Sequence, residues 1–160
     1  MDEKKLKSSY LEFSKNNHPD LYMNDEAKYN QALDLTSLNN RAYKQLKSFN
    51  KRLSYILTLN SVLDESKNKI PQSFLMEMMD VNETIMDLKM DPDSDKQSKL
   101  VKEIEELEDS LNFSILELAR VADGLNGDER NSKLEQIKDF YLKQKYVLRL
   151  KESLDTFAPL

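Results

Sequence analysis

Cysteine is absent from this 160-residue chain, and histidine occurs once, as His18. The lack of cysteine excludes thiolate nucleophiles, disulfides and metal centres held by this chain's own thiolates. A single histidine excludes a His-rich catalytic metal site, and no pairing of a nucleophile with a base can be assembled from what is left. The sequence therefore predicts no enzyme, no bound metal and no cofactor.

Glycine and proline are also scarce, with two and four copies. Tight hairpins and phosphate-binding loops need these residues, so long helices are the expected structure. No apolar run approaches the ~20 residues that cross a bilayer, and the N-terminus does not resemble a signal peptide. We therefore expect a cytoplasmic protein without a membrane partner.

Charge is distributed unevenly along the chain. Residues 1–60 carry 10 Lys and Arg against 7 Asp and Glu, whereas residues 61–160 carry 14 against 22. Neutralising nucleic-acid phosphates requires clustered positive charge, which the acidic second part lacks. We expect no nucleic-acid partner.

Apolar residues recur at helical spacing almost everywhere, and no strand-like alternation is sustained. The predicted fold class is all-α. The expected helices cover residues 2–16, 25–47, 51–59, 71–90, 94–124 and 129–157. The polar segment 60–70 is interpreted as a linker between a helical hairpin, residues 1–59, and an antiparallel three-helix bundle, residues 71–160.

The side chains expected to face inward follow the same spacing. In the first two helices they are Leu6, Tyr10, Phe13, Leu35, Leu38, Ala42 and Leu46. In the last two they are Leu100, Ile104, Leu107, Leu111, Leu118, Leu125, Leu134, Ile137, Tyr141, Leu148 and Leu154.

Two apolar stripes occupy the helix expected at residues 71–90. At about 100° per residue, one face carries Phe74, Met78, Val81, Ile85 and Leu88. Roughly 130° away lies a second stripe made of Leu75, Met79, Met86 and Met90, with Met76 beyond it. Because methionine-rich surfaces suit partner binding, we interpret the second stripe as a docking surface. The alternative is that it packs against the short helix or the N-terminal part.

The acidic residues Asp91, Asp93 and Asp95 imitate the first ligand positions of a calcium-binding loop. Such a loop needs glycine and a bidentate glutamate at two later positions, where Lys96 and Lys102 stand instead. We therefore interpret the segment as the acidic start of a helix.

The tripeptide His18-Pro19-Asp20 lies in the loop between the first two helices, and the sequence Asn40-Arg41-Ala42-Tyr43 follows in the second. This arrangement resembles the second half of a J-domain, the module that stimulates ATP hydrolysis by DnaK-type chaperones. The alternative is a solvated turn in which the proline simply ends a helix.

The J-domain resemblance implies a binding surface for a DnaK/HscA-type ATPase chaperone. Its positive charge, expected to steer the hairpin toward an acidic groove, comes from Lys4, Lys5, Lys7 and Lys15. In this interpretation Asp20 offers its carboxylate to an arginine, Pro19 holds the loop shape and His18 supplies a hydrogen-bonding ring.

The sequence FLMEMMDV at residues 74–81 is similar to the opening of the C-terminal domain of HscB/Jac-type iron–sulfur cluster co-chaperones. The residues Phe140-Tyr141-Leu142 in the last helix also resemble that family. The resemblance implies that an IscU-type scaffold protein binds at Leu75, Met76 and Met79. It places Asp80 and Glu83 beside that site, together with an aromatic residue of the last helix, Tyr141 or its neighbour Phe140.

The chain also departs from the J-domain pattern. A complete J-domain begins with a further helix, and its absence is interpreted as a truncation. Asn39 stands where an apolar residue is usual, and Ser48-Phe49 replaces a common Asp-Pro, which weakens the expected packing of the second helix.

The resulting prediction is a monomeric co-chaperone that stimulates a DnaK/HscA-type ATPase and delivers an IscU-type scaffold to it. The alternative is a structural helical bundle that self-associates through its methionine stripe or acts as a passive adaptor.

Overall fold

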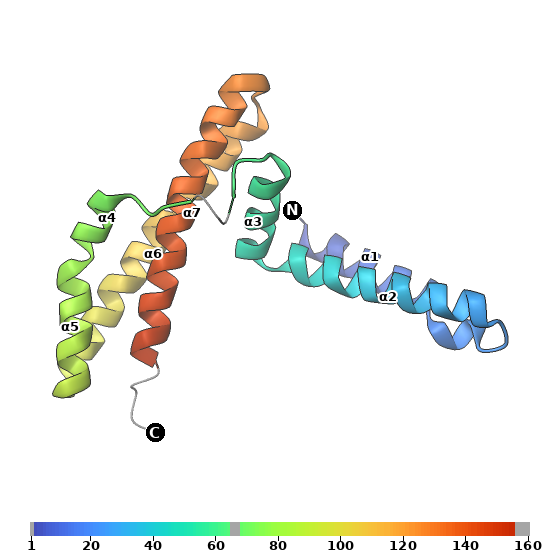
Figure 1. Ribbon diagram of the computed structural model, residues 1–160, viewed down its shortest axis with the longest axis horizontal. Coiled ribbons are helices and arrows are strands. Elements are labelled where there is room, and N and C mark those ends of the chain that lie inside the picture. The colour runs from blue at the N-terminus through green and yellow to red at the C-terminus, as the bar shows by residue number, and fades with distance from the viewer. Residues whose placement is uncertain (1, 65–67, 156–160) are drawn as a thin grey trace. The chain divides into compact units, whose positions relative to one another are not determined.

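The computed structural model describes residues 2–64 and 68–155, and every regular element in these ranges is helical (Figure 1). The predicted all-α fold is therefore confirmed. The chain divides into two compact units, Met1–Ile56 and Leu57–Leu160. Among the described helices, none combines the length and apolar character that crossing a membrane requires.

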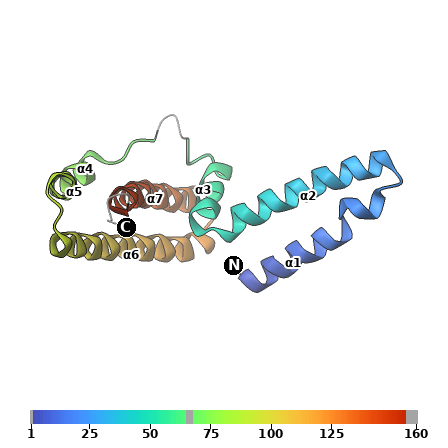
Figure 2. The ribbon, with the colours of Figure 1, turned by 90° about the horizontal axis from the view of Figure 1, so that it is seen from below.

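The N-terminal unit is built on an antiparallel pair of helices, α1 (Glu3–Asn16) and α2 (Glu26–Lys47), which lie side by side in Figure 2. Each begins at an aspartate whose carboxylate accepts hydrogen bonds from the free N–H groups of the first turn. Asp2 accepts from the amides of Lys4 and Lys5, and Asp25 accepts from the amide of Lys28 at 3.1 Å. These caps explain why both helices match their predicted bounds within one residue.

Tyr10, one of the residues predicted to face inward, contacts α2 through both its ring and its hydroxyl. The Tyr10 ring stacks on the Tyr43 ring with centroids 4.2 Å apart, and its hydroxyl donates to Asn40 Oδ1 at 2.8 Å. The expectation that Leu38 and Ala42 face inward is wrong, because both are exposed. The residues of α2 that contact α1 lie roughly 100° around the helix from the predicted apolar stripe.

Of the positions that depart from the J-domain pattern, Asn39 takes part in this packing, whereas Ser48 begins the next helix. Asn39 donates through Nδ2 to the Tyr10 carbonyl at 3.0 Å and to Ser14 Oγ at 2.9 Å. The Ser48 carbonyl accepts from the Arg52 amide at 2.9 Å, which starts α3 (Phe49–Leu59) two residues earlier than expected. At Asn39, hydrogen bonds thus replace the expected apolar packing.

The boundary between the units falls within α3. Leu57 is fully buried, and its carbonyl accepts from the amides of Val62 and Leu63, which are buried as well. The end of α3 therefore folds with the C-terminal unit, before the boundary expected at residue 59. Residues 65–67 of the expected linker lie outside the described residues.

The single helix expected over residues 71–90 is interrupted. It forms α4 (Gln72–Glu77) and α5 (Met79–Met90), separated at Met78, whose ψ of 2° departs from helical geometry. The Asn82 side chain donates to the Met78 carbonyl at 2.6 Å and to the Tyr146 hydroxyl at 2.8 Å. A side chain that bonds to the backbone four residues earlier bends a helix, which accounts for the difference.

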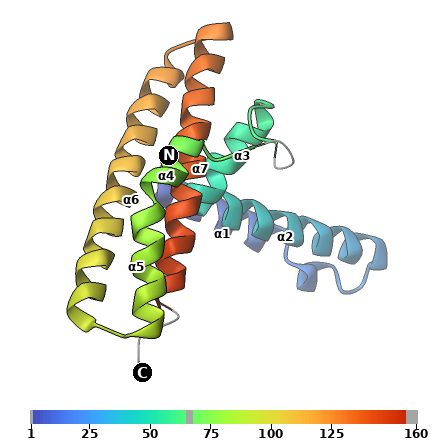
Figure 3. The ribbon, with the colours of Figure 1, turned by 60° about the vertical axis from the view of Figure 1, so that its left-hand side comes forward.

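Two long helices, α6 (Ser94–Asp123) and α7 (Gly127–Asp155), form an antiparallel pair with α5 alongside (Figures 1 and 3). Asp93 caps α6 by accepting from the amides of Asp95 and Lys96, which confirms the acidic helix start. The backbone hydrogen bond from Lys96 is the main cause of a lowered pKa at Asp93; desolvation, the next cause, opposes it, and the hydrogen bond from the Asp95 amide adds to the lowering. The last two residues expected in the final helix, 156 and 157, lie outside the described range.

The core of the C-terminal unit confirms most of the predicted inward residues. Its main cluster contains Phe74, Met78, Val81, Ile85, Leu88, Leu100, Ile104, Leu111, Val147, Leu150 and Leu154. Full burial of one such side chain contributes about 1.5–3 kcal/mol. The prediction differs at Leu148, which is only half-buried, whereas Val147 and Leu150 are buried instead.

Candidate functional site

The His18-Pro19-Asp20 loop forms a short 3-10 turn, η1 (Pro19–Tyr22), between α1 and α2. Pro19 is buried, which fixes the turn, while the side chains of His18 and Asp20 are 56% and 73% exposed. The Leu21 amide donates to the His18 carbonyl at 3.0 Å and closes the turn. The loop thus presents an imidazole and a carboxylate outward on a rigid support.

The imidazole of His18 is oriented by its own loop. Its Nδ1 accepts a hydrogen bond from the Asp20 amide at 3.3 Å and lies 3.4 Å from Asp20 Oδ2. A neutral ring that accepts at Nδ1 carries its proton on Nε2. His18 can therefore offer a hydrogen-bond donor at Nε2 to a partner, next to the free face of the Asp20 carboxylate.

The four predicted lysines of α1 are all exposed: Lys4, Lys5, Lys7 and Lys15. Lys4 and Lys7 also line a shallow pocket of about 300 Å³ together with Tyr43 and Lys47 of α2. The positive surface therefore continues from α1 onto α2 through Lys47. The sequence pattern did not single out Lys47, because its place depends on how the two helices pair.

The two stripes of the third predicted helix separate as expected into a buried and an exposed face. The exposed one, here called the Met face, consists of Leu75, Met76, Met79, Met86 and Met90. Their exposed fractions run from 38% at Leu75 to 87% at Met90. Asp80 and Glu83 are exposed beside the Met face on α5. Within the C-terminal unit, this surface is thus open to a partner.

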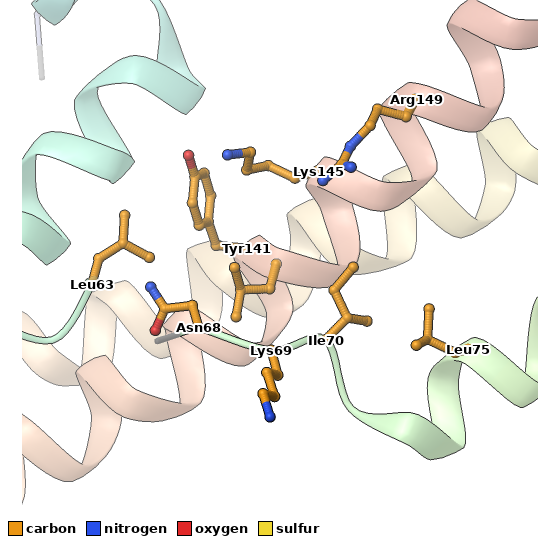
Figure 4. A pocket seen from close by; sticks show the side chains of 9 residues that line it. Leu63, Asn68, Lys69, Ile70, Leu75, Tyr141, Lys145 and Arg149 are labelled. Atoms are coloured by element: carbon orange, nitrogen blue, oxygen red, sulfur yellow. The ribbon is translucent and has the colours of Figure 1, made fainter. Parts of the chain in front are cut away.

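The aromatic residues predicted to join this surface have different surroundings. Tyr141 lines a groove of about 580 Å³ that Leu75 also lines, but its side chain is only 6% exposed (Figure 4). Phe140 packs against the main core cluster, and Lys143 Nζ lies 5.6 Å from its ring centroid. The structure therefore brings Tyr141, rather than Phe140, together with Leu75.

A third aromatic residue of α7, Tyr146, was missed by the sequence reasoning. Its ring meets the Phe74 ring edge-on, with centroids 6.0 Å apart and planes at 79°, and its hydroxyl accepts from Asn82 on α5. Tyr146 thus contacts both α4 and α5 beside the Met face. Identifying Tyr146 requires knowing which residues of α5 and α7 lie opposite each other, and the sequence alone does not show this.

No group of three or more potential metal-ligating side chains gathers anywhere in residues 2–64 or 68–155. The candidate sites are two exposed surfaces, the loop on the N-terminal unit and the Met face with its groove on the C-terminal unit.

Comparison with known proteins finds a matching family model for the C-terminal part and curated relatives of the chain. The family model described as the HSCB C-terminal oligomerisation domain matches residues 70–155. The protein named J-type co-chaperone jac1, mitochondrial, of Schizosaccharomyces pombe is 36% identical over 118 residues, which cover 68% of this chain and 51% of that protein. Co-chaperone protein HscB of Proteus mirabilis is 30% identical over 98 residues, which cover 59% of this chain and 57% of that protein.

The chain thus spans about half the length of the curated relatives it matches. The family model, however, covers more than half of the chain and contains α4 to α7 whole. On this match, the chain belongs to the HscB/Jac family of J-type co-chaperones.

Proposed function

We propose that this chain is a co-chaperone with two binding ends and no catalytic activity of its own. The N-terminal unit stimulates the ATPase of a DnaK/HscA-type chaperone, and the C-terminal unit holds an IscU-type iron–sulfur scaffold protein. By binding both, the chain raises the effective concentration of the scaffold beside the chaperone.

The geometry of the His18-Pro19-Asp20 loop carries the first half of the proposal. Stimulating a partner's ATPase requires a contact that stabilises one conformation of that partner more than another. The exposed carboxylate of Asp20 is suited to a charge-assisted hydrogen bond with an arginine. His18 adds a donor at Nε2, and the buried Pro19 fixes the loop backbone, which lowers the conformational entropy lost on binding.

The open Met face supports the second half. Methionine side chains are flexible and polarizable, so they adapt to an apolar partner surface. Leu75 lines the groove, where an apolar partner residue can be buried, and Met79 is exposed on the next helix, α5. Hot spots of this kind form around a few apolar anchors at the centre of an interface.

The cytoplasmic location expected from the sequence stays a prediction, since one of the relatives is named as mitochondrial. The monomeric state stays a prediction as well, and the description of the matching family domain includes oligomerisation.

The decisive experiment measures single-turnover ATP hydrolysis by purified DnaK- and HscA-type chaperones with this chain added in excess. We expect faster hydrolysis with the natural chain and no stimulation with His18→Gln. The matched control is Asn24→Gln, a conservative change of an exposed residue in the same loop. It should stimulate like the natural chain.

Circular dichroism should show equal helicity for the three proteins, and scaffold binding should be unchanged by His18→Gln. Stimulation that survives His18→Gln, or hydrolysis at the unaided rate with the natural chain, would contradict the J-domain half of the proposal.

A further inference from the structure

The last helix carries a charge pattern that docking through the Met face does not require. Residues 141–151 of α7 include four cations and no Asp or Glu: Lys143, Lys145, Arg149 and Lys151. The surrounding chain is acidic, with 14 Lys and Arg against 22 Asp and Glu over residues 61–160. The positive run is therefore a local feature of α7.

Three of these four cations make contacts within the unit. Lys151 Nζ lies 3.2 and 3.3 Å from carboxylate oxygens of two glutamates on α6. Lys143 Nζ lies over two aromatic rings, at 5.2 and 5.6 Å from their centroids. Lys145 Nζ lies 5.9 Å from the centroid of the Tyr141 ring. Lys145 and Arg149 are both exposed, and neither forms an ion pair with a carboxylate in the described parts of the chain.

Lys145 and Arg149 both line the groove of about 580 Å³ that Leu75 and Tyr141 also line (Figure 4). The other lining residues are Leu63, Asn68, Lys69, Ile70 and Leu142. An apolar wall next to three positive charges, Lys69, Lys145 and Arg149, complements an aliphatic side chain with a carboxylate beside it. The groove therefore favours a partner segment that carries a carboxylate beside an aliphatic side chain, a preference that a purely apolar cleft would not have.

The groove is continuous with the Met face, because Leu75 belongs to both. Charges of opposite sign flank the combined surface, with Asp80 and Glu83 on α5 and Lys145 and Arg149 on α7. A partner bound across it needs the inverse arrangement, since like charges facing each other across an interface are strongly unfavourable. The surface thus fixes the direction in which a partner lies.

We propose that the groove binds a segment of the scaffold protein in which an Asp or Glu adjoins an aliphatic residue. The carboxylate contacts Lys145 and Arg149, and the aliphatic side chain enters between Ile70, Leu75 and Leu142. This inference rests on the proposed function, since it names the chemistry of the scaffold segment that the same surface receives.

The test compares scaffold affinity among three proteins by isothermal titration calorimetry, using a purified IscU-type scaffold protein as the probe. Lys145→Gln with Arg149→Gln should weaken binding about 10-fold and flatten its dependence on salt concentration. The matched control removes the same charge from α6 by Lys99→Gln with Lys102→Gln. Neither of these lysines lines the groove, and both are exposed.

The outcomes separate this inference from the proposed function. If the natural chain binds the scaffold and Leu75→Ala with Met79→Ala weakens binding, but the groove variant binds normally, the groove inference is overturned and the docking function stands. An equal loss in the α6 control also overturns it, because long-range charge alone then explains the effect. If the natural chain binds no scaffold, the docking function itself fails.

A second measurement identifies the carboxylate directly. Each exposed Asp and Glu of the scaffold is replaced in turn by Lys, and each variant is titrated with Lys145→Glu, Arg149→Glu. We expect one scaffold variant to bind this charge-reversed chain more tightly than it binds the natural chain. Absence of any such pair overturns the inference.

Discussion

The side-chain amide of Asn82 on α5 donates a hydrogen bond of 2.8 Å to the Tyr146 hydroxyl on α7. The same amide donates to the Met78 carbonyl at 2.6 Å. One side chain therefore holds both the break between α4 and α5 and the aromatic ring that packs edge-on against Phe74.

Removing that hydroxyl should weaken the C-terminal unit without disturbing ring packing. For Tyr146→Phe we expect the free energy of unfolding, measured with urea, to fall by about 1 kcal/mol. Tyr146→Ala also loses the packing and should cost about 3 kcal/mol or more. As a control, Tyr55→Phe removes the hydroxyl of an exposed tyrosine and should change little. Equal stability of Tyr146→Phe and the natural chain would show that the bond contributes nothing.

The Met face should be separable from the core by mutation. Leu75→Ala with Met79→Ala should reduce scaffold affinity by about 10-fold or more while lowering the melting temperature only slightly, because both side chains are exposed. The buried Ile85 of the same helix provides the contrast, since Ile85→Ala should cost about 2–5 kcal/mol. A large fall in melting temperature for the double variant would place its residues in the core.

Lys151 should make a pH-dependent contribution to stability. Its hydrogen bond to Glu108 is the main cause of a pKa above the ordinary 10.5, with Glu105 assisting and desolvation opposing. A raised folded-state pKa stabilises the fold below the unfolded pKa and loses that effect as pH rises through the folded value. The melting-temperature difference between the natural chain and Lys151→Gln should therefore be constant near neutrality and close above pH 10.5. A difference that persists there would contradict the ion pairing.

Sedimentation velocity distinguishes the adaptor from a self-associating bundle. We expect the natural chain to sediment mainly as a monomer of 18.7 kDa. A stable oligomer that dissociates on replacing Met79 by Glu would instead support self-association through the Met face.

Much of the fold follows from local signals in the sequence. Asp2, Asp25 and Asp93 mark helix starts by residue type alone, and the spacing of Val81, Ile85 and Leu88 identifies a buried face. These features depend on a few neighbouring residues. They were predictable for that reason.

The structure differs from the prediction at positions where two helices meet. The break at Met78 depends on Asn82, whose amide also bonds to a tyrosine 64 positions later. Likewise, Asn39 acts as a packing residue only because the Tyr10 carbonyl and Ser14 lie opposite it on α1. Pattern reasoning assigns apolar residues to interfaces and therefore missed contacts made by amides.

The same limit applies to the candidate site. The loop residues His18, Pro19 and Asp20 are contiguous and were found together, as was the Met face. The groove instead combines Ile70, Leu75 and residues of α7 that lie about 70 positions later in the chain. Its charge pattern was visible only after the register of the helices was known.

Because of the interruption at Met78, Leu75 and Met76 belong to α4, whereas Met79 belongs to α5. The two parts of the Met face are thus carried by two different helices, α4 and α5. During evolution, substitutions in one of these helices can therefore change one part of the proposed scaffold-binding surface while the other part is kept.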